Sequence, residues 1–129
     1  MLRKRWKKFS DKIDEKYQGY DIRLASYGAN FFGLESLGSK QVRGNGILFL
    51  MPDVLIFEQW VPNSILEIPL RQITEVTVVM GHLRKTKGKP LLKVSFQSQG
   101  GIIDSAAWWV QDLEKWEHNL RLYSLKEDF

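Results

Sequence analysis

The sequence has no cysteine, only two histidines and only four prolines among its 129 residues. Without cysteine the chain can form neither a disulfide nor a thiolate metal site, and it has no thiol nucleophile. A disulfide is not needed at this length, because a chain of about 130 residues buries roughly two-thirds of its unfolded surface on folding. The composition therefore predicts one globular domain with a core of its own, and it fits a reducing compartment.

Long apolar runs are also absent. The longest candidate spans residues 47–57 and is interrupted by Pro52 and Asp53, whereas a membrane-spanning helix needs roughly 18 consecutive apolar residues. The basic start of the chain is followed by Ser10, Asp11 and Lys12, where a signal peptide would have its apolar region. The sequence therefore predicts a cytoplasmic protein without a transmembrane segment.

The positive charge is concentrated in two places. Residues 1–16 hold seven Lys and Arg against three acids, which accounts for the whole net charge of +4. A second window without any acid contains Arg84, Lys85, Lys87, Lys89 and Lys93. We therefore expect a basic arm attached to a neutral body that carries one basic loop.

The apolar periodicity divides the chain into a helix, a set of strands and a second helix. Spacings of three and four predict an amphipathic helix over 1–18, ended by Gly19, with the apolar stripe Leu2, Trp6, Phe9, Ile13 and Tyr17. Seven antiparallel strands follow, at 30–36, 41–51, 54–60, 65–70, 75–80, 91–97 and 102–110. The pair Asn45-Gly46 is a hairpin signal inside the second run, and it leaves that boundary open.

Helical periodicity returns after Val110. Apolar residues at 113, 116, 120 and 123 predict a last helix, with Asp112 capping its first turn and Glu117 paired with Arg121. Alternation sends Trp108 and Trp109 to opposite faces of the preceding strand, so one ring belongs to the core. The fold class is mainly β: seven antiparallel strands followed by a C-terminal helix, with an extra N-terminal helix.

Three runs resemble a known family. Gly44–Leu50 (GNGILFL), Val54–Phe57 (VLIF) and Leu66–Ile73 (LEIPLRQI) look like the outline of the GRAM family within the pleckstrin-homology-like superfold. Met51 stands where that family usually has threonine. The resemblance covers about residues 30–125. It implies a domain over 19–129 whose half-open barrel is plugged by the last helix, acting as a membrane-associating or protein-binding module.

Residues suited to catalysis are few. His82 and His118 are expected at the surface, Asp104-Ser105 is expected as a polar pair on an exposed sheet face, and no metalloprotease, nucleophile-elbow or P-loop spacing occurs. We therefore expect no enzyme activity, no catalytic residue, no metal site and no cofactor.

The two basic segments are the candidate binding site for an anionic lipid or a partner. The residues concerned are Arg84, Lys85, Lys87 and Lys89 in the loop and Arg3, Lys4, Arg5, Lys7 and Lys8 in the arm. The alternative for the loop is a solvated hairpin tip. For the arm, packing of its apolar stripe on the domain is favoured over contact with a membrane.

The function predicted from the sequence is that of a non-catalytic binding module. Its partner is an anionic membrane surface, approached peripherally, or another protein. One alternative is a small enzyme or ligand carrier that uses the barrel interior. Another is a polyanion or nucleic-acid binder, which is less favoured because the interleaved aromatic and basic pattern of such surfaces is missing.

Overall fold

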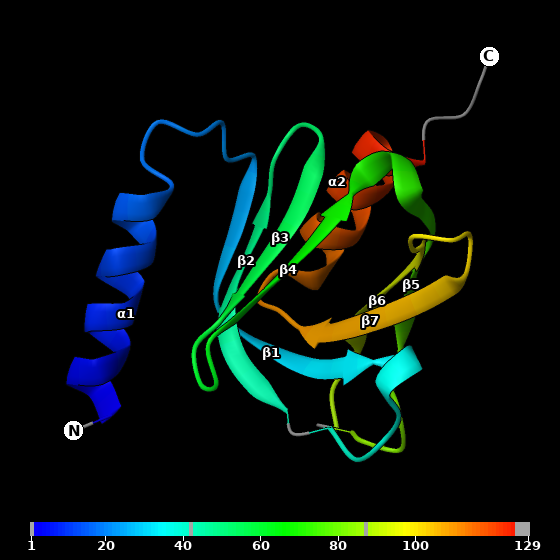
Figure 1. Cartoon of the computed structure of the whole chain (residues 1–129), viewed down its shortest axis with the longest axis horizontal. Helices are drawn as coiled ribbons and strands as arrows, with labels where there is room; N and C mark the ends of the chain where they lie inside the picture. Colours follow the sequence, from blue (N-terminus) through cyan, green and yellow to red (C-terminus); the bar gives the residue numbers. More distant parts are fainter. Residues whose placement is uncertain (1, 42, 87, 126–129) are drawn as a thin grey trace.

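A computed structural model describes residues 2–41, 43–86 and 88–125. In chain order, the elements are α1 (Leu2–Lys16), β1 (Leu24–Leu34), the 3-10 turn η1 (Glu35–Leu37), β2 (Gly44–Leu50), β3 (Val54–Gln59), β4 (Ser64–Pro69), the 3-10 turn η2 (Leu70–Gln72), β5 (Ile73–Val79), β6 (Leu91–Gln97), β7 (Ile103–Trp109) and α2 (Leu113–Ser124). Figure 1 shows the strands wrapped around α2, with α1 on the outside.

The seven strands form one antiparallel sheet in the order β4-β3-β2-β1-β7-β6-β5. β1 pairs with β2 through its first part and with β7 through its last part, and register shifts interrupt both pairings. Gly28 and Gly33 lie at these shifts with φ of 83° and 109°, a backbone region that side chains other than glycine rarely adopt. The two glycines let β1 bend from one half of the sheet into the other, which makes the sheet a half-barrel.

The concave side of the half-barrel holds the main core, which α2 covers. Trp116 and Leu120 of α2 are buried with Trp108, Phe57 and Leu92 of the sheet in one cluster. Trp108 and Trp116 expose only 0% and 1% of their surface. The predicted fold class is therefore confirmed, as are the core positions of Trp116 and of one ring of the Trp108-Trp109 pair.

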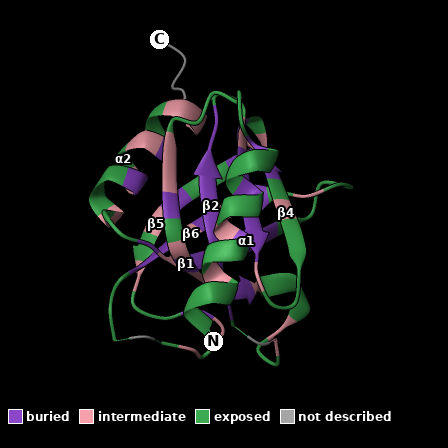
Figure 2. Ribbon diagram, turned by 90° about the vertical axis from the view of Figure 1, so that its left-hand side faces the viewer, coloured by how far each residue is buried: buried purple, intermediate pink, exposed green. Residues whose placement is uncertain are grey.

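Helix α1 packs on the convex side of β2 and β3. Phe9, Ile13 and Tyr17 are buried with three sheet residues, Ile47, Phe49 and Ile56, and with Met51 just after β2. Figure 2 shows α1 lying over buried strands with its outer face exposed. The expectation that the apolar stripe packs on the domain is confirmed for these three residues, because stripe and sheet bury each other's apolar surface.

A buried carboxylate ties the end of α1 to β3. Glu58 is 5% exposed, and its Oε2 accepts a hydrogen bond from the Tyr17 hydroxyl and one from Lys16 Nζ at 2.6 Å. A charge at this depth costs several kcal/mol unless it is paired and hydrogen-bonded. Lys16 and Tyr17 compensate it together, so this contact specifies where α1 lies on the sheet.

Two local predictions were wrong in detail, and the boundary left open at Asn45-Gly46 is resolved in favour of a continuous strand. The first strand begins at Leu24 rather than at residue 30, because the Gly28 bulge interrupts the alternation that marks a strand. Asn45-Gly46 makes no hairpin but lies inside β2, where a Cβ on Gly46 would come within 2.2 Å of the Glu58 carbonyl oxygen. Asp112 precedes α2 with φ of 56° and makes no side-chain cap, although its carbonyl accepts from Trp116 N at 3.1 Å.

The pair Asp104-Ser105 is buried, not exposed. Asp104 accepts hydrogen bonds from the Ser36 amide at 2.9 Å and the Ser36 hydroxyl at 2.7 Å, and Ser105 Oγ donates to Glu35 Oε2 at 2.8 Å. These bonds hold the η1 turn against β7 and satisfy side chains that burial removes from water. The arrangement accounts for the two polar residues structurally.

Candidate functional site

The basic loop between β5 and β6 begins with a tight turn. His82 and Lys85 form an antiparallel bridge in which each amide donates to the other's carbonyl at 2.9 Å. The two residues between them, Leu83 and Arg84, have φ of 54° and 64°. Positive φ at both central residues is the signature of a type I′ hairpin turn, which favours Asn and Gly rather than Leu and Arg. The strained backbone presents the exposed Arg84 side chain at the tip.

The base of this loop is anchored to the connection between β1 and β2. Lys85 Nζ donates to the Ser39 carbonyl at 2.6 Å, and His82 Nε2 lies 3.1 Å from the Gly33 carbonyl oxygen. His82 is 6% exposed, so its predicted surface location was wrong, whereas His118 is exposed as expected. Burial lowers the pKa of His82. The contacts of His82 indicate a structural role.

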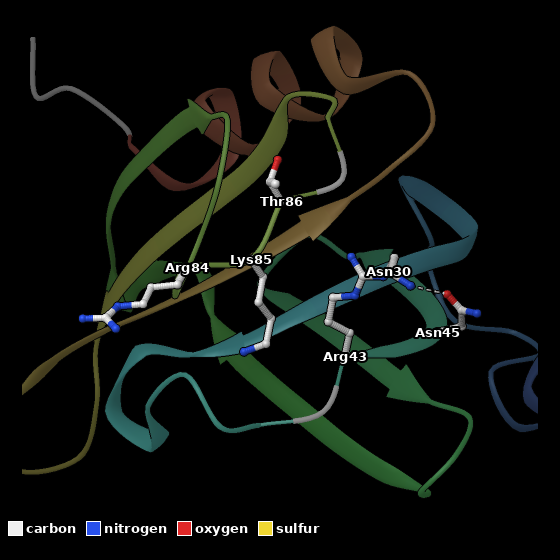
Figure 3. A pocket seen from close by; sticks show the side chains of 6 residues that line it. All are labelled: Asn30, Arg43, Asn45, Arg84, Lys85 and Thr86. Atoms are coloured by element: carbon white, nitrogen blue, oxygen red, sulfur yellow. Dashed lines mark hydrogen bonds between the residues drawn. The ribbon is translucent and has the colours of Figure 1, made fainter.

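A basic hollow of about 680 Å³ opens between the two connections (Figure 3). Its cationic side chains are Arg43, Arg84 and Lys85, and its other lining residues are Asn30, Asn45 and Thr86. Asn30 Nδ2 donates to Asn45 Oδ1 at 2.6 Å (Figure 3), while Asn30 Oδ1 is buried without a hydrogen-bond partner among the described residues. None of the described residues of the lining carries a carboxylate, so the hollow suits an anion rather than a cation.

Helix α1 brings two further arginines to the same part of the surface. Arg3 lines a hollow of about 390 Å³ with Leu2, Trp6, Gly28, Asn45 and Trp60. Arg5 lines a second hollow of about 390 Å³ together with Arg43, Trp60 and Val61. Asn45 lines all three hollows, and Arg43 lines two of them. The arm and the loop, which lie about 80 residues apart in the sequence, are therefore neighbours in the fold.

The other predicted site residues differ in their surroundings. Lys4 and Lys8 are exposed and lie one helical turn apart on the outer side of α1. Lys7 forms an exposed ion pair with Asp11 at 2.8 Å, and Lys89 Nζ lies 5.6 Å from the ring centroid of Trp109. Lys87 lies outside the described residues. Arg3, Arg5, Arg84 and Lys85 are thus the predicted residues that the hollows bring together.

The predicted site missed Arg43. Its guanidinium lies 4.9 Å from the ring centroid of the buried Phe32, between the arm and the loop. The sequence offered only a weak signal, because Arg43 and Lys40 are the two charged residues between Glu35 and Asp53 and do not form a dense basic run like those of the arm and the loop. Arg43 becomes part of the site only because β2 starts beside β1 and near the β5–β6 loop.

The basic and acidic residues of the molecule are unevenly distributed over its surface. The described residues of four segments, 2–8, 35–43, 60–63 and 80–90, lie toward the lower edge of Figure 1. Their described residues include ten Lys and Arg and a single acid, Glu35, whereas the remaining described residues include seven Lys and Arg and twelve acids. We call these four segments the basic end. The body outside the arm has a net charge of zero, as the sequence predicted, and the fold places its basic and acidic residues in different parts of the surface.

Within the described ranges no three His, Cys, Asp or Glu side chains gather in a way that could hold a metal ion. No described helix is both long and apolar enough to cross a bilayer.

Comparison with known proteins supports the fold but not a family. No family model matches the chain, and no curated protein matches it. A chain of the 8S snRNP assembly intermediate is 11% identical, with a TM-score of 0.61, over 84% of this chain and 86% of that one. The C-terminal domain of an unknown protein from Leishmania infantum is 13% identical, with a TM-score of 0.61, over 91% of this chain and 95% of that one. Similarity at these identities concerns the fold alone.

Proposed function

We propose that the chain is a non-catalytic binding module that docks peripherally on anionic membranes through its basic end. The observation that carries this proposal is that Arg3, Arg5, Arg43, Arg84 and Lys85 line adjoining hollows in which no described lining residue carries a carboxylate. Guanidinium and ammonium groups without neighbouring acids are attracted to phosphate-rich surfaces, and the guanidinium, which four of these five residues carry, is the more weakly hydrated of the two.

The expected strength follows from the number of charges. A basic residue near an anionic surface contributes about 1 kcal/mol, so five residues supply at most about 5 kcal/mol, which corresponds to a sub-millimolar dissociation constant. The outer lysines Lys4 and Lys8 would add to this sum if α1 lies along the surface. The proposal therefore concerns reversible, salt-sensitive attachment.

The architecture is compatible with the family resemblance. The open sheet order, with α2 over the concave face, is the arrangement that the pleckstrin-homology-like assignment implies, and the GRAM-type assignment is part of the proposal. The alternative of a carrier using the barrel interior is less supported, because Phe31, Phe57 and Trp108 fill that interior with ring centroids 5.2 to 5.8 Å apart.

Co-sedimentation with vesicles of increasing phosphatidylserine content tests the proposal. Binding should rise with the anionic fraction and fall steeply with salt. The double variant Arg43→Gln with Arg84→Gln should bind more weakly, whereas Arg71→Gln should bind like the parent. Arg71 serves as a single-charge control because it is also exposed but lies in η2, away from the basic end.

Arg84 is a better target than Lys85 for this experiment. The Lys85 ammonium donates to the Ser39 carbonyl, so its removal also loosens the loop. Absence of binding to anionic vesicles at low salt would refute the membrane proposal. In that case a protein with an acidic surface would become the preferred partner.

A further inference from the structure

We propose that the molecule inserts an apolar tip, formed by Leu2 of α1 and Val61 of the β3–β4 turn, into the interfacial layer of the membrane. This inference rests on the proposed membrane docking and adds the element that enters the bilayer and the orientation that follows. Leu2 and Val61 are 74% and 65% exposed, although both are apolar. Both line the hollow that also contains Arg5 and Arg43.

Two tryptophans lie beside the apolar tip and also pack on the sheet. The Trp6 and Trp60 rings lie edge to face with centroids 5.3 Å apart, and Phe9 lies within 6.2 Å of Trp60. Both indoles are half-buried, so they show one side to the tip while the other side packs on the sheet. Tryptophan in this position is typical of the membrane interface, where an apolar ring and a polar N–H are both accommodated.

The position of the charges around the apolar tip favours a lipid surface as the partner that the tip binds. Arg3 and Arg5 flank the apolar stripe of α1 on its two sides, and Arg43 adjoins the hollow beneath Val61. Apolar side chains at the centre of a cationic rim match a bilayer interface, which offers acyl chains beneath a layer of phosphates. The first turn of α1 also directs the positive end of its helix dipole to this side.

Insertion fixes the orientation of the whole domain. With Leu2 and Val61 in the interface, the basic end faces the lipid and α1 descends toward the membrane with its first turn foremost (Figure 1). The acidic residues of the remaining chain then lie away from the phosphates. This orientation explains why the tip is apolar while the rest of the basic end is charged.

A label at Val61 tests insertion directly. The chain lacks cysteine, so Val61→Cys in the full-length protein can be labelled at a single site with an environment-sensitive fluorophore. On phosphatidylserine vesicles its emission should shift to the blue. The matched control is Ile102→Cys, because Ile102 is 68% exposed and precedes β7 outside the basic end. Its label should report no change. An unshifted label at position 61 on vesicle-bound protein overturns the inference while leaving the proposed function standing.

Removing the apolar side chains without changing charge supplies a second readout. The double variant Leu2→Ser with Val61→Ser should bind anionic vesicles at least about tenfold more weakly at every salt concentration, with an unchanged salt slope. Ile102→Ser with Leu122→Ser should bind like the parent, since these residues are similarly exposed elsewhere. Equal affinity of parent and Leu2/Val61 variant overturns the inference. If the parent itself binds no vesicle, the proposed function and the inference fail together.

Discussion

Replacing Arg84 by glycine should make the protein more stable and a weaker membrane binder. Arg84 and its neighbour Leu83 hold positive φ values of 64° and 54° in the turn between His82 and Lys85. A side chain in this left-handed region costs roughly 1 to 2 kcal/mol, and glycine avoids most of that cost. The variant Arg84→Gly should therefore gain about 1 kcal/mol in free energy of unfolding, or about 3 to 5 °C in Tm.

Arg84→Ala separates the two effects. Alanine removes the same guanidinium from the hollow but keeps the strained backbone, so its stability should stay within about 0.5 kcal/mol of the parent. Both variants should lose about 1 kcal/mol of vesicle affinity, which is about fivefold. A functional side chain held at a conformational cost would account for this opposition between stability and binding.

Urea unfolding followed by tryptophan fluorescence measures the first quantity, and co-sedimentation with phosphatidylserine vesicles measures the second. Trp108 and Trp116 are both buried, so their emission reports on the core. The reasoning about the turn is refuted if glycine is no more stable than alanine at an unchanged m-value. The reasoning about the site is refuted if both variants bind vesicles as tightly as the parent.

Three further predictions concern the fold. Trp116→Ala should lower the free energy of unfolding by about 3 to 5 kcal/mol, because loss of the indole would leave a cavity between α2 and the concave face of the sheet. A decrease below about 1 kcal/mol in equilibrium unfolding would contradict the place of Trp116 in the core. Gly46→Ala should lower the free energy of unfolding by at least about 2 kcal/mol, since the alanine Cβ would overlap the backbone of Glu58. An unchanged thermal midpoint would contradict this packing. Burial lowers the pKa of His82 below 6.5; the unfolded chain then binds the proton first, and the free energy of unfolding should decrease as the pH falls below about 6.5. His82→Gln should flatten that dependence, and an identical pH profile for the two proteins would exclude His82 as its cause.

Local sequence was sufficient to predict an element where each of its faces has the same surroundings along its whole length. The bounds predicted for β6, residues 91–97, are those observed, because its alternation reflects one buried face and one wetter face. Both helices were predicted from their apolar stripes, and the Glu117–Arg121 pair forms at 2.7 Å. Prediction was poorer for β1, which pairs with two strands through two bulges, so that no single alternation runs along it.

The buried polar residues also show where local sequence was insufficient for prediction. His82, Asp104 and Ser105 were assigned to the surface because polar residues usually lie there. Each is buried beside a partner distant in sequence: His82 with the Gly33 carbonyl, Asp104 with Ser36 and Ser105 with Glu35. Partners of this kind are brought together by strand pairing, and the local sequence does not indicate which residues they are.

The sequence by itself determined the class of fold, the two basic segments and the absence of thiol chemistry, because periodicity and composition are local properties. Only the tertiary structure decided that the arm and the loop are neighbours, that Arg43 joins them, and that Leu2 meets Val61 at one hollow. The physical reason is that a site of this kind depends on distances between segments far apart in the chain. Those distances follow from how β1 bends between the two halves of the sheet and from where α1 packs upon it.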